Sequence, residues 1–157
     1  MIYIGDLVNT HGIKGEVRLI SSFKYKDIIF KKGSHLYIGA DVLTVNSYRV
    51  HKNYDMLTFL EIKDIDEVLK YKGKEVFIKE EDFTFPEVLP EKLIGHEVYD
   101  KEKLGEVEEI LLTPAHEILV VRNEKGTFQV PYVKAFIREI NNQKIYINVI
   151  EGLLNED

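Results

Sequence analysis

Cysteine is absent from the 157 residues of this chain. The absence excludes a disulfide framework, a thiolate nucleophile, and zinc or iron–sulfur sites that use cysteine ligands. The chain also lacks the run of ~20 apolar residues that a membrane-spanning helix needs, and its first residues show no basic segment followed by a long apolar one. The sequence therefore predicts a protein of the reducing cytoplasm that has no membrane partner.

The five histidines show no pattern that would build a catalytic or metal site. No two histidines have the i, i+4 spacing of a helical metal site, and none lies beside a Gly-x-Ser-x-Gly turn. The neighbouring carboxylates Glu106, Glu108 and Glu109 are more typical of a solvated face, because catalysis requires convergent groups with perturbed pKa values. We expect neither an enzyme nor a bound metal or cofactor.

Two prolines, Pro86 and Pro90, mark a segment of unusual composition, residues 80–92 (EEDFTFPEVLPEK). Proline has no backbone N–H and favours an extended residue before it, so neither a central strand nor a helix fits this segment well. The segment contains Phe, Val and Leu instead of the Gly and Ser of a flexible tether, so we expect it to pack against a neighbour. We interpret it as a linker between an N-terminal domain, residues 1–79, and a C-terminal domain, residues 93–157.

All of the net charge lies in the second half of the chain. Residues 1–84 contain 13 basic and 13 acidic side chains, whereas residues 85–157 contain 8 basic and 14 acidic ones. An acidic module repels nucleic acid phosphate and suits a basic partner.

Short alternating stretches separated by turn residues predict a mainly β N-terminal domain. The expected strands cover residues 2–8, 16–20, 35–38, 42–52, 56–61 and 74–79. Gly12 and Gly15 bracket the first turn, since glycine reaches positive φ without steric cost. Because the stretch after them alternates like a strand, we do not expect a phosphate-binding loop, which needs a helix after its glycines.

Two further signals support a barrel. The apolar phase of the strand at residues 42–52 changes between Val45 and Tyr48, which predicts a β-bulge of the kind that bends a sheet. Asp64 followed by Glu67 predicts a capped short helix. Five or six strands with one short helix before the last indicate a small antiparallel barrel.

The C-terminal domain has the same ingredients. Its expected strands lie within residues 93–98, 104–107, 118–122, 127–130 and 144–149. Pro131 must end its strand or lie at an edge, because it cannot donate to a strand ladder, and residues 132–136 suit a short helical turn. The predicted fold class is mainly β: two small antiparallel β-barrels joined by a short linker, with one short helix in each half.

Residues 8–18 (VNTHGIKGEVR) resemble the opening signature of the RimM family of ribosome maturation factors. The resemblance continues through residues 48–52, 56–59 and 64–78. The second half resembles the PRC-barrel domain of the same family. Its matching stretches are residues 93–95, 104–107, 115–121, 130–133 and 151–154. The resemblance implies a six-stranded N-terminal barrel like a domain of translation factors, followed by a PRC barrel.

The resemblance also implies a function. It predicts a monomeric factor that binds the immature small (30S) ribosomal subunit, its 16S rRNA, and the basic head protein numbered nineteen. Such a factor assists head assembly and 16S rRNA processing without catalysis. The residues expected to face the ribosome or RNA are Thr10, His11, Gly12, Lys14, Gly15, Arg18, Arg49, His51 and Lys52. Those expected to bind the ribosomal protein are Val88, Leu89, Leu93, Ile94, Phe128, Pro131 and Tyr132.

Two adjacent positions depart from the family pattern. Many members carry two adjacent tyrosines, associated with binding the small subunit, where this chain has Val88 and Leu89. The apolar character is kept, but the phenol hydroxyls are not.

Two alternatives stay open beside the assembly factor. The first is a free-standing RNA-binding module that uses the first barrel, although free RNA binding favours a basic domain and this half is neutral. The second is a PRC-type sensor or scaffold that binds other proteins, although a scaffold would not explain the N-terminal motifs.

Overall fold

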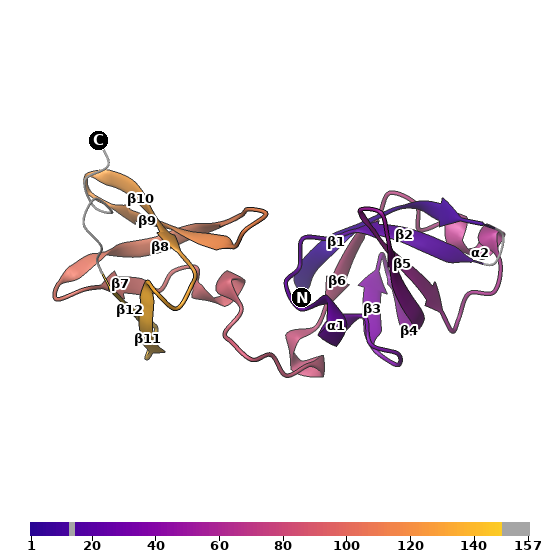
Figure 1. Cartoon of the computed structure of the whole chain (residues 1–157), viewed down its shortest axis with the longest axis horizontal. Coiled ribbons are helices and arrows are strands. Elements are labelled where there is room, and N and C mark those ends of the chain that lie inside the picture. Colours follow the sequence, from indigo (N-terminus) through magenta and orange to yellow (C-terminus); the bar gives the residue numbers. More distant parts are fainter. Residues whose placement is uncertain (13–14, 149–157) are drawn as a thin grey trace. The chain divides into compact units, whose positions relative to one another are not determined.

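A computed structural model describes residues 1–12 and 15–148 (Figure 1). The chain divides into two compact units, Met1–Pro86 and Glu87–Asp157, and each unit has its own hydrophobic core. Strands dominate both units, which confirms the mainly β fold class. In the part of the chain that the structure describes, no helix has the length and apolar character needed to cross a membrane.

The first unit is a closed six-stranded barrel with the strand order β1-β2-β5-β4-β3-β6. Its strands are β1 (Ile2–His11), β2 (Glu16–Ile20), β3 (His35–Ile38), β4 (Asp41–His51), β5 (Tyr54–Phe59) and β6 (Glu75–Ile78). All neighbouring strands run antiparallel, as predicted. The short helices are α1 (Lys26–Ile29), α2 (Ile65–Leu69) and the 3₁₀ helix η1 (Glu80–Asp82). The sequence predicted α2 alone, because a single turn such as α1 carries no helical periodicity.

The predicted β-bulge in β4 is confirmed. Before the bulge Val45 pairs with Phe59, and after it Tyr48 pairs with Leu57, with a register shift between Val45 and Ser47. The extra residue keeps apolar side chains facing inward on both sides of the shift. It also adds the local bend that a strand in a small barrel requires.

The predicted cap of α2 is confirmed as well. The Asp64 carboxylate accepts a hydrogen bond from the Glu67 backbone N–H at 3.1 Å. The Glu67 carboxylate in turn accepts one from the Lys63 N–H at 3.2 Å. In a standard capping box the Glu67 side chain would accept from the N–H of the N-cap residue, Asp64; here it accepts from the N–H of the residue before it.

Helix α1 docks on the barrel through one buried carboxylate. Asp55 on β5 is buried and accepts a hydrogen bond from the Tyr48 hydroxyl at 2.7 Å. The Lys26 ammonium of α1 lies 2.9 Å from the other carboxylate oxygen. Burial and the contact with Asp55 raise the pKa of the Tyr48 phenol. Beside this pair, Ile29 and Phe30 enter the hydrophobic core.

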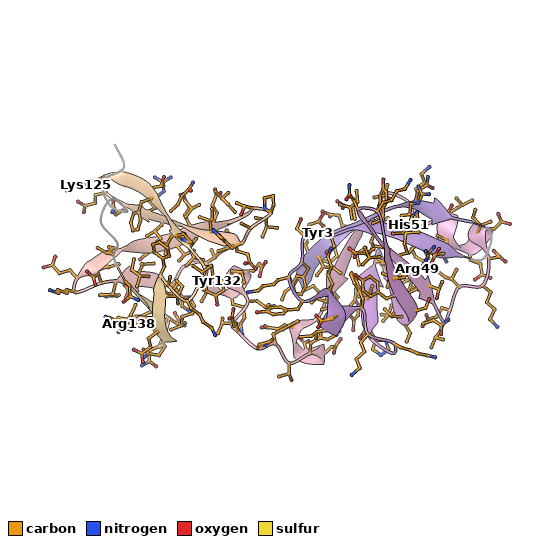
Figure 2. The ribbon with its side chains drawn as sticks, viewed as in Figure 1. Tyr3, Arg49, His51, Lys125, Tyr132 and Arg138 are labelled. Carbon is orange, nitrogen blue, oxygen red and sulfur yellow. The ribbon has the colours of Figure 1, made fainter. Side chains whose placement is uncertain are left out.

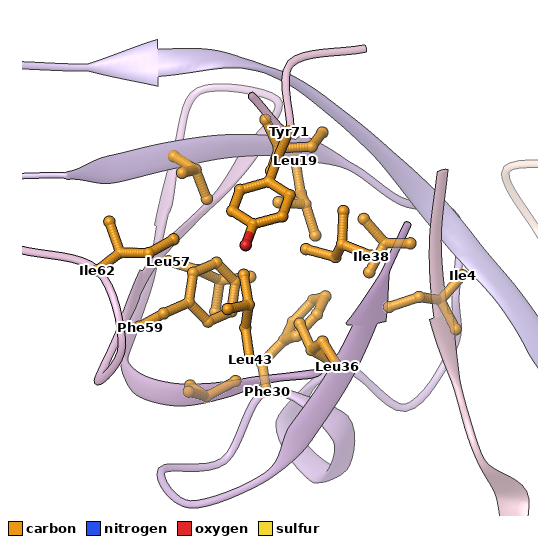
Figure 3. Packing of buried hydrophobic residues seen from close by; sticks show 14 of the residues in the cluster. Ile4, Leu19, Phe30, Leu36, Ile38, Leu43, Leu57, Phe59, Ile62 and Tyr71 are labelled. Atoms are coloured by element: carbon orange, nitrogen blue, oxygen red, sulfur yellow. The ribbon is translucent and has the colours of Figure 1, made fainter. Parts of the chain in front are cut away.

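The core of the barrel is aliphatic with a few aromatic rings (Figure 3). Tyr71, which follows α2, points its ring into this cluster, and the residue is only 4% exposed. Its hydroxyl donates a hydrogen bond to the Asp41 carboxylate at 2.7 Å. Burial and this bond raise the pKa of Tyr71 to about 12.

The second unit contains a six-stranded sheet in the order β10-β9-β8-β7-β12-β11. Its strands are β7 (Glu97–Tyr99), β8 (Lys103–Leu112), β9 (Glu117–Asn123), β10 (Gly126–Pro131), β11 (Ile137–Asn141) and β12 (Lys144–Ile147). The sequence predicted an antiparallel barrel, but β7 and β12 pair in parallel. Among the described residues, hydrogen bonding also leaves β10 and β11 at the two edges of the sheet. Pro131 ends β10 at an edge, as predicted.

The helix of the second unit is the 3₁₀ helix η2 (Pro90–Leu93). The helical turn expected at residues 132–136 is present as a single turn that does not extend into a helix; the N–H groups of Phe136 and Ile137 each donate a hydrogen bond of 3.0 Å to the Val133 carbonyl. Strand β11, which follows it, had no clear sequence signal, because its two isoleucines are separated by Arg138 and Glu139.

The segment at residues 80–92 packs as predicted: its first part packs within the first unit and its last part within the second. In the first unit, the Phe85 ring lies 5.8 Å from the ring of Phe23 and 5.4 Å from that of Tyr25. In the second unit, Leu89 is buried and the Tyr132 hydroxyl donates a hydrogen bond to the Val88 carbonyl at 2.5 Å. Between these anchored parts, Pro86 and Val88 are exposed.

We expect limited digestion with a glutamate-specific protease to cut first after Glu87, because its neighbours Pro86 and Val88 are exposed. Mass spectrometry should then find two stable fragments that divide at this bond. A Glu87→Gln variant serves as the control and should resist this first cut. Early cleavage within either unit, with residues 80–92 intact, would show that the units are not separate domains.

The buried Tyr71 phenol predicts a loss of stability at high pH. Its folded pKa of about 12 exceeds the ordinary value of ~10, so the native state holds the proton more tightly than the unfolded state does. The stabilisation is complete below pH ~10 and is lost as the pH rises through the folded pKa. Denaturant unfolding should show Tyr71→Phe less stable by about 1 to 2 kcal/mol near neutral pH and less sensitive to alkali. Equal alkaline losses in both proteins would contradict this role.

Candidate functional site

The outer face of β2, β5 and β4 gathers three of the predicted site residues. Arg18 on β2 and Arg49 on β4 both stand opposite Met56 on the intervening strand β5. His51 lies two residues beyond Arg49, on the same face of β4, and Tyr54 stands opposite it (Figure 2). Because side chains alternate along a strand, this row faces away from a barrel interior that holds Leu57 and its neighbours. We call this set the outer β2–β5–β4 face.

An ion pair crosses this face from one outer strand to the other. The Arg49 guanidinium donates two hydrogen bonds to the Glu16 carboxylate, from Nε to Oε2 at 2.9 Å and from Nη2 to Oε1 at 2.8 Å. Glu16 lies on β2 and Arg49 on β4, so the pair spans β5. The bonds to Glu16 raise the pKa of the Arg49 guanidinium. The Arg49 side chain is still 53% exposed, against 18% for Glu16.

Two residues that the sequence did not point to complete the face. The Arg18 guanidinium lies over the Tyr54 ring, 5.4 Å from its centroid, in a cation–π contact. Met56 is fully buried although it faces outward, since it lies between Arg18 and Arg49. The available signal was the alternation of residues 54, 56 and 58, which places them on the face opposite Leu57.

The hairpin tip between β1 and β2 forms a separate group. Thr10 pairs with Val17 near the end of β1. Gly12 and Gly15 have φ values of 74° and 82°, which confirms the predicted glycine turn. A Cβ at Gly12 would meet open space, whereas one at Gly15 would lie 3.2 Å from the Ile62 side chain. Lys14 and the side chain of His11 lie outside the described residues.

The structure does not bring all predicted residues of the first unit together. Lys52 lies in the β4–β5 turn with a φ of 57°. In the β2–β5 register, Val17 pairs with Leu57 and Leu19 with Asp55, so this turn and the β1–β2 tip lie at opposite ends of β2. Arg18, Arg49 and His51 stand between the two ends.

In the second unit, most of the predicted protein-binding residues belong to the core. Those buried are Leu89, Leu93, Phe128 and Tyr132, all at most 8% exposed. A side chain that is already buried cannot centre an interface unless it is first uncovered. Val88 and Ile94, at 43% and 53% exposed, remain accessible on either side of η2, and Pro131 is half-buried.

No metal-binding constellation appears in the parts of the chain at 1–12 and 15–148. Nowhere in them do three His, Asp or Glu side chains come together as ligands would.

Comparison with known proteins identifies the family. The model of the RimM N-terminal domain matches residues 2–83, and that of the RimM PRC barrel domain matches residues 90–152. Proteins named ribosome maturation factor RimM from Bacillus pumilus and Bacillus subtilis are 37% and 35% identical, in alignments that cover 98% of this chain and 96% of each relative.

A solved structure of a 16S ribosomal RNA processing protein RimM from Pseudomonas aeruginosa is 21% identical, with a TM-score of 0.47 over 95% of this chain and 97% of that one. The two domain models match in the expected order, and the Bacillus relatives align along nearly their whole length. The chain therefore belongs to the RimM family of ribosome maturation factors, as its motifs predicted.

Proposed function

We propose that this protein binds the immature small (30S) ribosomal subunit in the cytoplasm and assists assembly of its head and processing of its 16S rRNA. It does so as a monomer, by binding alone and without chemistry of its own. The observation that carries the proposal is the outer β2–β5–β4 face, where Arg18, Arg49 and Tyr54 lie side by side. The names of the relatives, which are ribosome maturation factors, support it.

The chemistry of the outer β2–β5–β4 face suits RNA. Guanidinium groups present planar forks of N–H donors that match phosphate oxygens. Tyrosine rings on the outer face of a small barrel are common platforms for unpaired bases. Arg18 already lies over Tyr54, so a cation and an aromatic ring are held together before any ligand arrives. We assign phosphate contacts to Arg18 and Arg49 and a base contact to Tyr54.

The second unit suits a basic protein better than RNA. The chain from residue 85 onward contains 14 acidic and 8 basic side chains. Ribosomal proteins are usually basic because they neutralise RNA phosphate, and the head protein numbered nineteen is the partner that the family resemblance implies. Val88 and Ile94 are exposed apolar residues that flank η2, and the Tyr132 hydroxyl fixes the Val88 carbonyl. We assign Val88 and Ile94 as the apolar anchors and Tyr132 as the residue that positions Val88.

Replacement of both arginines of the outer β2–β5–β4 face should weaken cosedimentation with immature small subunits. In Arg18→Gln/Arg49→Gln the glutamine stems still cover Met56, but two phosphate contacts are lost. The slope of log K against log salt should therefore become shallower by roughly 1.4, at ~0.7 per phosphate of a single strand. A matched control, Arg122→Gln/Arg138→Gln, removes the same charge from the second unit and should bind as the parent does. Equal binding by the two double variants would refute the RNA assignment.

The protein-binding assignment has its own test in the second unit. Val88→Ser/Ile94→Ser should dissociate faster from the purified head protein, because a few apolar anchors supply most of the affinity of such interfaces. Raised salt should mainly slow association. The control Leu112→Ser alters an equally exposed residue, at 55%, on β8. If Leu112→Ser loses as much affinity, or if binding depends neither on salt nor on Val88 and Ile94, this surface is not the protein-binding site.

Cosedimentation also separates the two alternative functions. A free-standing RNA-binding module would bind naked rRNA as tightly as immature subunits. A PRC-type scaffold would bind the head protein without any contribution from Arg18 or Arg49. An assembly factor should prefer immature subunits over both naked rRNA and mature ribosomes.

A further inference from the structure

In the unbound protein, Glu16 occupies the donor edge of Arg49 that a phosphate would use. The two bonds from Nε and Nη2, at 2.9 and 2.8 Å, form the side-by-side arrangement that guanidinium makes with any two-oxygen anion. A carboxylate and a phosphate therefore compete for the same edge. Arg49 cannot offer this edge to RNA until Glu16 leaves it.

We propose that Glu16 is a specificity-determining residue of the outer β2–β5–β4 face. Its carboxylate competes with RNA phosphate for Arg49, so Arg49 contributes to RNA binding only when a phosphate displaces the Glu16 carboxylate. The inference rests on the proposed function and names the regulation of the same site. A ligand that offers one isolated phosphate gains little by exchanging one anion for another. A ligand that also contacts Arg18 and Tyr54 gains binding free energy from these further contacts when it displaces the Glu16 carboxylate.

The Glu16–Arg49 pair is placed so that it can open. The Arg49 side chain is 53% exposed, so water and salt reach the guanidinium. The Glu16 side chain is only 18% exposed, but it becomes hydrated once the pair opens, and ion pairs at the protein surface contribute little to folding stability. Glu16 is also the first residue of β2, next to the β1–β2 turn, so its side chain can turn towards solvent without disturbing the ladder.

The barrel also determines where the Arg49 side chain lies after Glu16 has left it. Met56 stands opposite Arg49 and is fully buried, so it offers the aliphatic part of the Arg49 side chain an apolar surface to pack against. On the other side of Met56 lies Arg18, which is held over the Tyr54 ring. Release of Glu16 therefore leaves two guanidinium groups in register on one face, and it opens the Nε–Nη2 edge of Arg49 to a phosphate.

The second unit provides a matched control. Arg122 on β9 makes the same two-bond contact, from Nε and Nη2 to the carboxylate of Glu108 on β8. Both residues are exposed, with side chains at 58% and 38%. The Glu108→Gln change removes the same charge from the same kind of pair, at a distance along the chain from the outer β2–β5–β4 face. It separates a specific effect of Glu16 from a general loss of negative charge.

The experiment measures binding of a fluorescent single-stranded oligouridine of about ten nucleotides, within the ~4–16 nucleotide range of small barrels, by anisotropy across a salt series. Glu16→Gln should bind it roughly two- to fivefold more tightly, the range that an exposed ion pair can withhold. The slope of log K against log salt should steepen by up to about 0.7, because no displaced Glu16 carboxylate is left to take up a cation when a phosphate binds Arg49. Glu108→Gln should match the parent protein. Glu16→Gln/Arg49→Gln should match Arg49→Gln, since the gain acts through Arg49.

Three results would overturn the inference. Weaker binding by Glu16→Gln, with an unchanged melting temperature, would make Glu16 a residue that only positions Arg49. An equal gain in Glu108→Gln would reduce the effect to net charge. Unchanged binding by Glu16→Gln would show that no competition exists. If Arg18→Gln/Arg49→Gln still loses small-subunit binding in these cases, the proposed function stands and only the role of Glu16 falls. If the parent protein binds neither RNA nor subunits, both fall.

Discussion

Closure of the first sheet is the constraint on which the outer β2–β5–β4 face depends. Each strand of the barrel has a hydrogen-bonded neighbour on both sides, so no strand can slip by one residue without turning its apolar set outward. The register shifts between Leu7 and Asn9 and between Val45 and Ser47 absorb the curvature. With the register fixed in this way, Arg18, Met56 and Arg49 are held in one row across three strands.

The row of Arg18, Met56 and Arg49 shows how a barrel with a hydrophobic core can carry charged side chains on its outer face. An arginine stem packs well on apolar surface while its guanidinium stays in water. Met56 supplies that surface on the outside of the barrel, and a thioether chain adapts easily to the stems around it. The same strand contributes Leu57 to the interior. One short strand therefore serves the core on one face and the charged surface on the other.

Local signals in the sequence were sufficient for much of the fold. The bulge in β4, the Asp64 cap of α2, the glycine turn at Gly12 and Gly15, and the edge position of Pro131 each leave a signal in residue types or spacings that are close in the chain. The Glu16–Arg49 pair joins residues 33 positions apart, and it depends on the lateral order of the strands. No pattern within either strand could reveal it.

The second unit shows a different limit of sequence reasoning. Leu89, Phe128 and Tyr132 have the residue types of interface anchors, but the same types fill hydrophobic cores, and these three are buried. Tertiary packing alone distinguishes the two roles. The parallel pairing of β7 with β12 was equally hidden, because a three-residue strand such as β7 carries no directional signal.

That parallel pairing also sets the time at which the second unit can fold during synthesis. β7 begins at Glu97 and its partner β12 at Lys144, so the sheet stays incomplete until the chain has been made as far as β12. The first barrel needs only the chain up to Ile78 for the β1–β6 pairing that closes it. At ~5–20 residues per second, the interval between these two points is roughly 3 to 13 seconds. Arg18 and Arg49 are therefore in place while the ribosome that makes the protein is still adding its second unit.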